Sequence, residues 1–296
     1  MTDAVTRGVV PPRRDGTPGA GGPRGVVPPR RDGTPGAGGP RGVVPPRRDR
    51  LVLETVLVLA VGLGQSAVYS ILRIIERLTR EVSLSQQTSS LNVSVTPDRP
   101  WLDLAYQVTN LAFGLAPPAL ALFLLTQVRP FPEGVWRGLG LDPGQPGRDV
   151  RRGVALFAAI GVPGLGLYLG ARALGLNTQV QAANLGEVWW TVPVLVAAAA
   201  VAAISEEVVM IGYLFTRWRQ ARWTPWVVVV TSAVVRGSYH LYQGFGGFVG
   251  NLVMGVIFGL VYLRTRRVMP LVIAHFLLDV ASFVGYSLLA GRVSWL

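Results

Sequence analysis

Six ionisable side chains lie deep within apolar segments in the second half of the chain. They are two adjacent glutamates, an arginine and a histidine four residues apart, and a histidine and an aspartate four residues apart: Glu206, Glu207, Arg236, His240, His275 and Asp279. An ionisable residue at the centre of a bilayer costs at least ~2.5 to 3.5 kcal/mol on insertion scales, so it needs a partner or a wet cavity. The set includes both histidines of the chain. We therefore expect one polar cluster assembled from three helices.

The spacing of these residues indicates which of them act together. Adjacent helical residues point about 100° apart, so Glu206 and Glu207 cannot face one site equally and should have different roles. Residues four apart share one face of a helix, which applies to the Arg–His pair and to the His–Asp pair. Asn251 follows a glycine-rich break and adds an amide donor that can support the same region.

Three kinds of role fit such a cluster. Two histidines, a glutamate and an aspartate or asparagine can bind a divalent metal. They can also activate water and stabilise an oxyanion without a metal. The third role is to fasten helices together, which does not require so many ionisable types in one place. The absence of cysteine excludes a thiol nucleophile, a thiolate metal site and a disulfide scaffold.

The elements that must position these residues are membrane helices. The chain has 296 residues, of which 50% are hydrophobic and 15% charged, whereas soluble domains carry about 25% charged residues. An ordinary soluble enzyme is therefore excluded. Apolar blocks of sufficient length predict seven spans, at residues 52–72, 104–126, 153–172, 191–215, 223–242, 247–263 and 269–290. We expect an all-α, polytopic membrane helix bundle, with close helix contacts at two glycine pairs, Gly166 with Gly170 and Gly255 with Gly259.

The distribution of arginine predicts the orientation of this bundle. All 28 basic residues are arginine, and 21 of them fall in the N-terminal segment and in the loops after the second, fourth and sixth spans. The positive-inside rule then places the N-terminus in the cytoplasm and the C-terminus outside a plasma membrane that the chain crosses several times. Because the arginines are spread over loops and tail and not gathered on one folded surface, no nucleic-acid partner is expected.

Residues 1–50 form a separate segment. Residues 7–23 are repeated identically at 24–40, and a third copy begins at residue 41. The segment holds 10 Pro and 11 Gly and few large apolar side chains, so we expect a disordered tail ahead of the bundle at 51–296. Its 10 Arg against 4 Asp could bind anionic lipid headgroups, or the tail could be solvated and only set topology.

Three motifs in the expected order resemble a known family. They read SEEVVMIGYL at 205–214, RGSYH at 236–240 and HFLLD at 275–279. This pattern, over about residues 190–290, is similar to that of the CPBP family, the CAAX-protease and bacteriocin-processing (Abi) intramembrane proteases. Two positions depart from it: Ile211 stands where the family usually has Arg, and Arg236 stands where Phe is common.

The resemblance implies hydrolysis of a peptide bond in a membrane-associated polypeptide by activated water. Glu206, beside Glu207, would polarise or deprotonate the water with the assistance of His240. His275 and Asp279 would orient the tetrahedral intermediate or ligate a metal. The implied metal is one divalent ion, zinc by preference, held by Glu206, His240 and His275; a metal-free glutamate mechanism is the alternative.

The missing family arginine leads to a specific expectation. A guanidinium is always protonated, and Arg236 lies one turn from His240 on the same helix face. Glu207 is the nearest acid without another expected partner, so we expect Arg236 to pair with Glu207 and to supply the charge that Ile211 does not.

Two other function classes stay open at this point. Ile211 favours a family member that has lost activity and serves as a membrane scaffold or immunity factor. Intramembrane glutamate and histidine are also typical of a small-solute or proton transporter, although the two halves of the chain show no convincing repeat.

Overall fold

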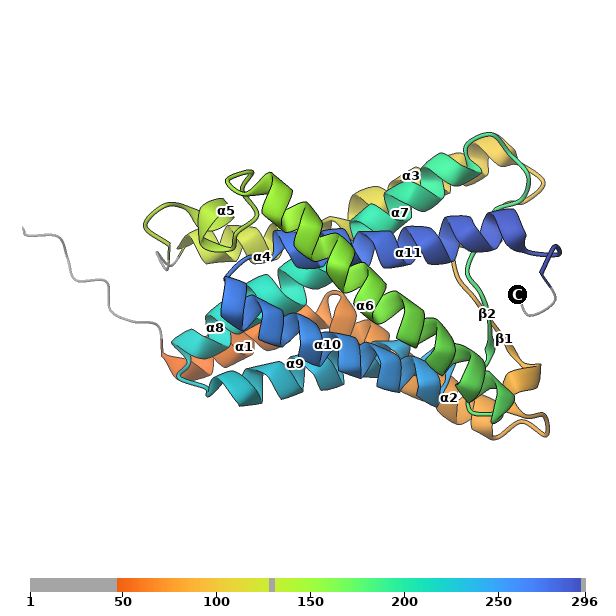
Figure 1. The fold of residues 1–296 in the computed structure, drawn as a ribbon, viewed down its shortest axis with the longest axis horizontal. Coiled ribbons are helices and arrows are strands. Elements are labelled where there is room, and N and C mark those ends of the chain that lie inside the picture. The colour runs from red at the N-terminus through yellow and green to blue at the C-terminus, as the bar shows by residue number, and fades with distance from the viewer. Residues whose placement is uncertain (1–46, 128–130, 294–296) are drawn as a thin grey trace, which may run out of the picture. The chain divides into compact units, whose positions relative to one another are not determined.

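A computed structural model describes residues 47–127 and 131–293, which form a bundle of helices (Figure 1). The expected tail lies outside the described residues as far as residue 46, and the first helix already begins at Arg48. The helices before the site are α1 (Arg48–Ala60), α2 (Leu63–Leu78), α3 (Pro100–Gly114), α4 (Ala116–Gln127), α5 (Val135–Gly138) and α6 (Pro146–Ala173). Those that carry the site or follow it are α7 (Thr191–Glu206), η2 (Glu207–Tyr213), α8 (Leu214–Gln220), α9 (Pro225–His240), η3 (Leu241–Gln243), α10 (Phe245–Thr265) and α11 (Met269–Leu289).

The helical membrane fold is confirmed, but the count of seven spans is not. Among the described residues, five helical segments are long and apolar enough to cross a membrane: Pro100–Gln127, Pro146–Ala173, Thr191–Gln220, Phe245–Thr265 and Met269–Leu289. A sixth is formed if α1 and α2, which meet at an angle of 59°, are one broken span. The expected fifth span corresponds to α9, which has only 16 residues before it ends at His240.

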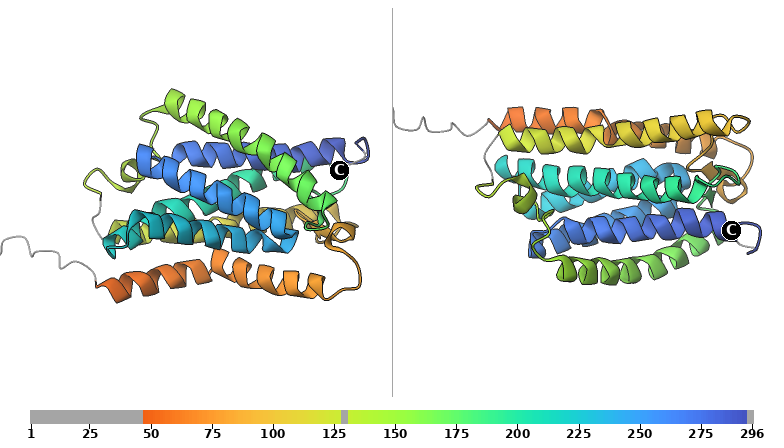
Figure 2. Two further views of the ribbon diagram at one scale, coloured as in Figure 1. Left: turned by 60° about the horizontal axis from the view of Figure 1, so that its bottom comes forward. Right: turned by 90° about the horizontal axis from the view of Figure 1, so that it is seen from above.

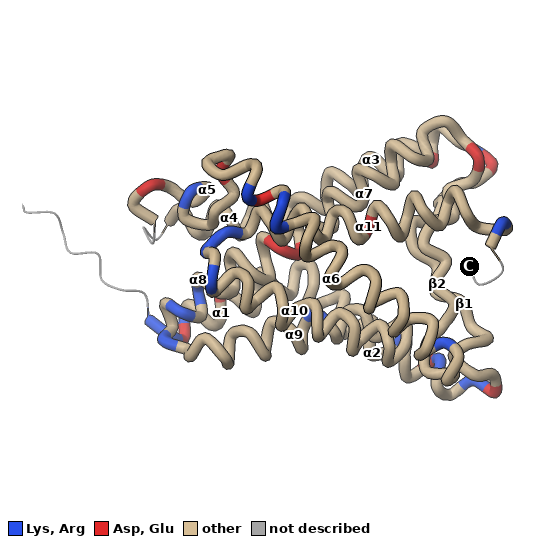
Figure 3. Tube along the Cα trace, viewed as in Figure 1, with Lys and Arg blue, Asp and Glu red and all other residues tan. Residues whose placement is uncertain are grey.

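Successive long helices run back and forth between the same two ends of the bundle (Figure 2). The start of α1 and the end of α11 lie at opposite ends in all views. Charged residues gather at these two ends and are sparse along the middle of the helices (Figure 3). This is the distribution expected of a bundle whose middle faces hydrocarbon.

Proline and glycine explain where several helices begin and how closely they pack. Proline occupies the first or second position of α3, α6, α9 and α11, where the missing N–H costs no hydrogen bond. At Gly255 of α10 an added Cβ would lie 2.8 Å from Ala233 Cα of α9, so the contact expected there is confirmed. At Gly259 an added Cβ would lie 3.1 Å from Val229 Cγ2, also of α9. The contact expected at Gly166 and Gly170 is wrong, because nothing lies within 4 Å of an added Cβ at either position.

Two short polar strands join the loops at the end of the bundle where α9 ends. β1 (Thr88–Ser90) pairs in parallel with β2 (Gln179–Gln181), with Thr88 opposite Gln179. Thr178, next to β2, donates its N–H to the carbonyl oxygen of Gln243 at 2.8 Å. The Ser70 hydroxyl of α2 accepts the N–H of Tyr242 at 2.6 Å. The 3₁₀ turn η3, which directly follows His240, is therefore held by α2 on one side and by this strand pair on the other.

Candidate active site

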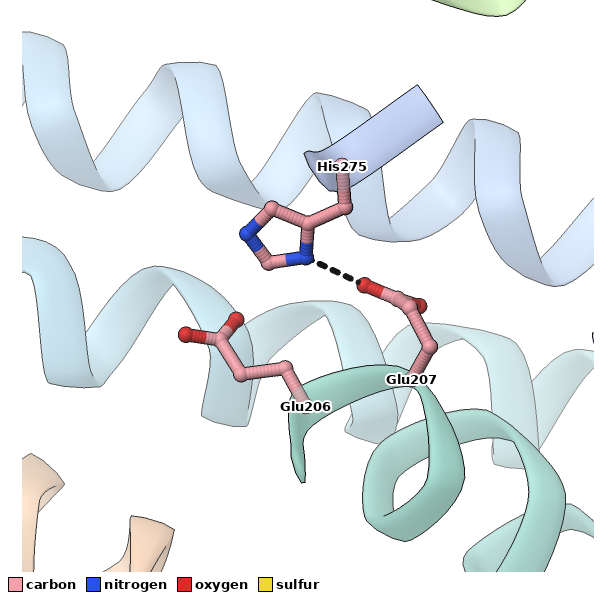
Figure 4. Close-up of side chains that lie close together, drawn as sticks. All are labelled: Glu206, Glu207 and His275. Carbon is pink, nitrogen blue, oxygen red and sulfur yellow. Dashed lines mark hydrogen bonds and ion pairs between the residues drawn. The ribbon is translucent and has the colours of Figure 1, made fainter. Parts of the chain in front are cut away.

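The two glutamates lie where the α-helix α7 changes into a π-helical segment. Glu206 is the last residue of α7, and η2 runs from Glu207 to Tyr213 with every residue buried. Short π segments inside α-helices are rare and occur frequently at functional sites. Figure 4 shows the two carboxylates pointing in different directions from this helix, with the His275 ring above them. The two carboxylates therefore have different surroundings, as their adjacent positions on a helix predict.

Glu207 is fully buried and is held by two partners. Its Oε1 accepts a hydrogen bond from Arg236 Nη2 at 2.8 Å and lies 2.7 Å from His275 Nδ1. Both Glu207 and Arg236 have no exposed side-chain surface. The expected pair between Arg236 and Glu207 is thus found, and Glu207 also fixes the orientation of the His275 ring. Ile211, one π turn further on, is buried in the apolar core and carries no charge toward the site.

Glu206 is the more open of the two glutamates. Its side chain is 12% exposed, and its Oε2 accepts hydrogen bonds from Arg236 Nη1 at 3.2 Å and from the Tyr239 hydroxyl at 2.6 Å. His240 Nε2 lies 4.0 Å from the same oxygen. Among the described residues, all of these contacts involve Oε2, so Oε1 is the oxygen that can meet a water molecule.

The two histidines differ in how fully they are engaged. Both ring nitrogens of His240 are buried without a hydrogen-bond partner among the described residues. His275 is bound to Glu207 through Nδ1, while its Nε2 lies 3.5 Å from Asp279 Oδ2, too far for a good hydrogen bond. Each histidine therefore retains a nitrogen that can interact with a bound molecule.

Three residues of the cluster lie close enough together to be candidate ligands of a divalent metal ion. Glu206, Glu207 and His275 offer ligand atoms that all lie within 4.8 Å of one another. Glu207 Oε2 is a further buried oxygen without a partner in the described part of the chain. Carboxylate oxygens and imidazole nitrogens are ligands that zinc accepts. The ligand set expected from the resemblance was Glu206, His240 and His275. In the structure Glu207 takes the place of His240 in this set.

Asn251 is not brought into the cluster by any contact described. Its Nδ2 donates to the carbonyl oxygen of Gly247 at 3.0 Å, within its own helix. A backbone bond of this kind satisfies a side-chain amide locally. The supporting role expected for Asn251 is without structural support.

Sequence reasoning missed Tyr239, which makes the shortest hydrogen bond to Glu206. A signal was present, because Tyr239 is three residues after Arg236 and residues at this spacing share a helix face. A second polar network, at the end of η2 and in α8, was also missed. There the fully buried Arg217 donates from Nε to Glu54 Oε1 at 2.7 Å, and the Tyr213 hydroxyl donates to the same oxygen at 2.8 Å.

Comparison with known proteins gives a family match, and it covers the part of the chain that contains the candidate site. Residues 188–281 match the family model described as Rce1-like, type II CAAX prenyl endopeptidase Rce1-like. This range runs from just before α7 into α11 and contains all six residues that we singled out inside the spans. No curated protein and no solved structure matches the chain. The resemblance to the CAAX-protease family is thereby confirmed for residues 188–281.

Proposed function

We propose that this protein is an intramembrane endopeptidase that uses Glu206 to activate water for hydrolysis of a peptide bond in a membrane-associated polypeptide. The observation that carries the proposal is the surroundings of Glu206. This partly exposed carboxylate lies among Arg236, Tyr239 and His240, directly before a π-helical segment whose residues are all buried. The match to a family of endopeptidases supports the same conclusion.

Glu206 is the general base in this proposal, and Glu207 is a positioning residue. A general base must be within reach of the proton that it removes. Glu207 is fully buried and its Oε1 is shared by Arg236 and His275, so it holds those two side chains in place. Glu206 has its Oε2 fixed by Arg236 and Tyr239 and presents Oε1 to water.

The proposed reaction uses these positions. Glu206 Oε1 takes a proton from water while the water oxygen attacks the carbonyl carbon of the scissile bond. The developing oxyanion is stabilised by His240 and His275, each of which has a nitrogen available. Glu206 then gives its proton to the leaving nitrogen as the C–N bond breaks, which yields a carboxylic acid and an amine. Glu207, which lies 2.7 Å from His275 Nδ1, fixes the imidazole during these steps and leaves Nε2 for the oxyanion.

A divalent ion would be held by Glu206, Glu207 and His275. When bound, such an ion polarises a carbonyl or lowers the pKa of a bound water. The contacts of Arg236, Tyr239 and His240 described above would serve the reaction equally in a metal-free mechanism.

The test is cleavage by purified protein reconstituted in lipid vesicles. The substrates are a prenylated peptide ending in a CAAX sequence, the same peptide without the prenyl group, and a set of transmembrane peptides, each with and without a chelator. Glu206→Gln should reduce cleavage by roughly 10² to 10⁴-fold, the usual contribution of a general base. The matched control is Glu187→Gln, which makes the same change at an exposed glutamate outside the cluster.

The outcomes separate the alternatives. Undiminished cleavage by Glu206→Gln protein would overturn the assignment of the base. Absence of cleavage of every peptide by folded wild-type protein would favour the inactive family member. Loss of activity with the chelator, restored by zinc, would identify a metal-assisted reaction, whereas unchanged activity would identify the glutamate mechanism.

A further inference from the structure

A groove of about 510 Å³ lies between α6 and α10, away from the glutamate cluster. Its volume is within the range of about 300 to 1,000 Å³ that is usual for small-molecule sites. The residues that matter for its chemistry are Arg152, Ala155 and Ala159 of α6 and Val261, Arg264 and Thr265 of α10. On α6 they are separated by three, four and seven residues, and on α10 Val261 lies three residues before Arg264 and four before Thr265, so each helix turns these residues toward the groove.

The groove is charged at its mouth and apolar further in. Figures 1 and 2 show α6 crossing α10, with the two helices diverging toward the end where α6 begins and α10 ends. Arg264 is the last residue but one of α10, and Arg152 lies in the second turn of α6. At a rise of about 1.5 Å per residue, Val261 lies about 4.5 Å deeper than Arg264, and Ala159 about 10 Å deeper than Arg152. A ligand with an anionic head and an apolar tail matches this order.

The two arginines have no acidic partner in the described part of the chain. The ion pairs found there include neither Arg152 nor Arg264. By contrast, Arg267 at the same end of the bundle is bound by both Asp142 and Asp149. Two uncompensated guanidinium groups beside an apolar groove therefore attract an anion, and guanidinium groups suit phosphate.

We propose that this groove binds an anionic glycerophospholipid. Its phosphate lies between Arg152 and Arg264, and one acyl chain runs along Ala155, Ala159 and Val261. The tail of this chain is a poor occupant, because residues 1–50 carry 10 Arg against 4 Asp and would be repelled by the two arginines. The proposal does not depend on the proteolytic function.

The test measures how much lipid stays bound to the intact, detergent-solubilised protein in native mass spectrometry. Phosphatidylglycerol and phosphatidylcholine with identical acyl chains are the probes. The double variant Arg152→Gln/Arg264→Gln removes the two groove cations. Arg151→Gln/Arg266→Gln is the matched control, because it makes the same charge change at two exposed positions that do not line the groove, one on α6 and one directly after α10.

Wild-type protein should retain phosphatidylglycerol in preference to phosphatidylcholine. The groove variant should bind phosphatidylglycerol roughly 30-fold more weakly, if each arginine contributes about 1 kcal/mol. The control variant should behave as the wild type. Equal losses in the two double variants would show that only diffuse surface charge is involved and would overturn the proposal, as would equal retention of the two lipids by wild-type protein.

A second pair of variants tests the apolar part without changing charge. Ala159→Phe fills the groove and should reduce retention of phosphatidylglycerol, whereas Ala158→Phe, at an exposed neighbouring position outside the groove, should not. Thermal unfolding in phosphatidylcholine shows whether each variant is folded.

Glycerol 3-phosphate should not compete with the lipid, because it has no acyl chain. Complete displacement of the lipid by glycerol 3-phosphate would show a simple phosphate site and contradict the proposal.

Discussion

Arg236 Nη2 lies 2.8 Å from Glu207 Oε1, and neither side chain has any exposed surface. The same guanidinium reaches Glu206 Oε2 through Nη1 at 3.2 Å, so one cation from α9 joins both glutamates. Breaking a buried ion pair by removing one partner leaves an uncompensated charge, which is much more costly than losing the pair as a whole. The relationship therefore makes a measurable prediction about stability.

Arg236→Ala should lower the free energy of unfolding by about 3 to 5 kcal/mol, because Glu207 is left buried with only His275 beside it. Adding Glu207→Gln should recover part of this loss. The measurement is a double-mutant cycle of unfolding in detergent. A second cycle with Glu206→Gln is the control, and its coupling should be smaller because Glu206 is partly exposed and more distant. If the changes in unfolding free energy of Arg236→Ala and Glu207→Gln simply add, the two side chains are not energetically coupled and the predicted pair is contradicted.

The residues that share helix faces could be predicted from the sequence, and so could their gathering from three helices. The pairing of Arg236 with Glu207 was predicted because a buried guanidinium needs an acid and Glu207 was the nearest without a partner. The choice between partners on different helices could not be predicted in the same way. His275 shares a face with Asp279 but makes its shorter contact with Glu207, because the rotation of α11 against α7 is set by packing along both helices.

Other features leave little trace in the sequence. The π-helical segment from Glu207 to Tyr213 has the same apolar composition as an ordinary α-helix. The strands at 88–90 and 179–181 consist largely of Thr, Ser and Gln and lack the apolar alternation that indicates a strand. The early end of α9 depends on Gly244, which turns the chain with a φ of 117°. An added Cβ at this position would lie 2.6 Å from Asn177 Cα. A glycine is visible in the sequence, but its contact with residue 177 is not.

Tyr239→Phe should impair catalysis more than folding. The hydroxyl donates to Glu206 Oε2 at 2.6 Å, and a hydrogen bond to a charged group contributes about 1.5 to 3 kcal/mol. We expect kcat to fall by roughly 10- to 100-fold with little change in KM, because the hydroxyl orients the base and does not bind substrate. Tyr106→Phe, at an exposed position on α3, is the control. An equal fall in kcat for both variants would exclude a role for Tyr239 in positioning Glu206.

Gly255→Ala should disturb the site through the contact between α9 and α10. The added Cβ would lie 2.8 Å from Ala233 Cα and 3.3 Å from Arg236 Cδ, so α9 must move at the turn that holds Arg236. Overpacking of this kind costs typically about 1 to 3 kcal/mol. The measurement is thermal unfolding together with peptide cleavage. Gly250→Ala makes the same change on the same helix, where the nearest atom is Leu167 Cδ2 at 3.4 Å, and should be tolerated.

Asp142, which lies outside the membrane spans, makes the stability of the fold depend on pH. Its pKa is lowered, first by the hydrogen bond that Oδ1 accepts from the Gly144 N–H at 2.7 Å and then by Arg267. A carboxyl whose pKa is lower in the folded state stabilises the fold above its ordinary pKa, and this contribution is lost as the pH falls through the folded value. Asp142→Asn should therefore flatten the acid part of a curve of melting temperature against pH. An unchanged curve would show that this carboxyl does not contribute.

The orientation of the bundle can be tested with reporters fused to the full chain. Because α1 begins and α11 ends at opposite ends of the bundle, the two termini of the helical part should lie on opposite sides of the membrane. The distribution of arginine places the start of α1 on the cytoplasmic side. A reporter after Leu296 should then be extracytoplasmic, and reporters inserted after Arg219 or Arg267 should be cytoplasmic. A cytoplasmic reporter at the C-terminus would mean that α9, with only 16 residues, or the bent pair α1 and α2 does not cross the membrane.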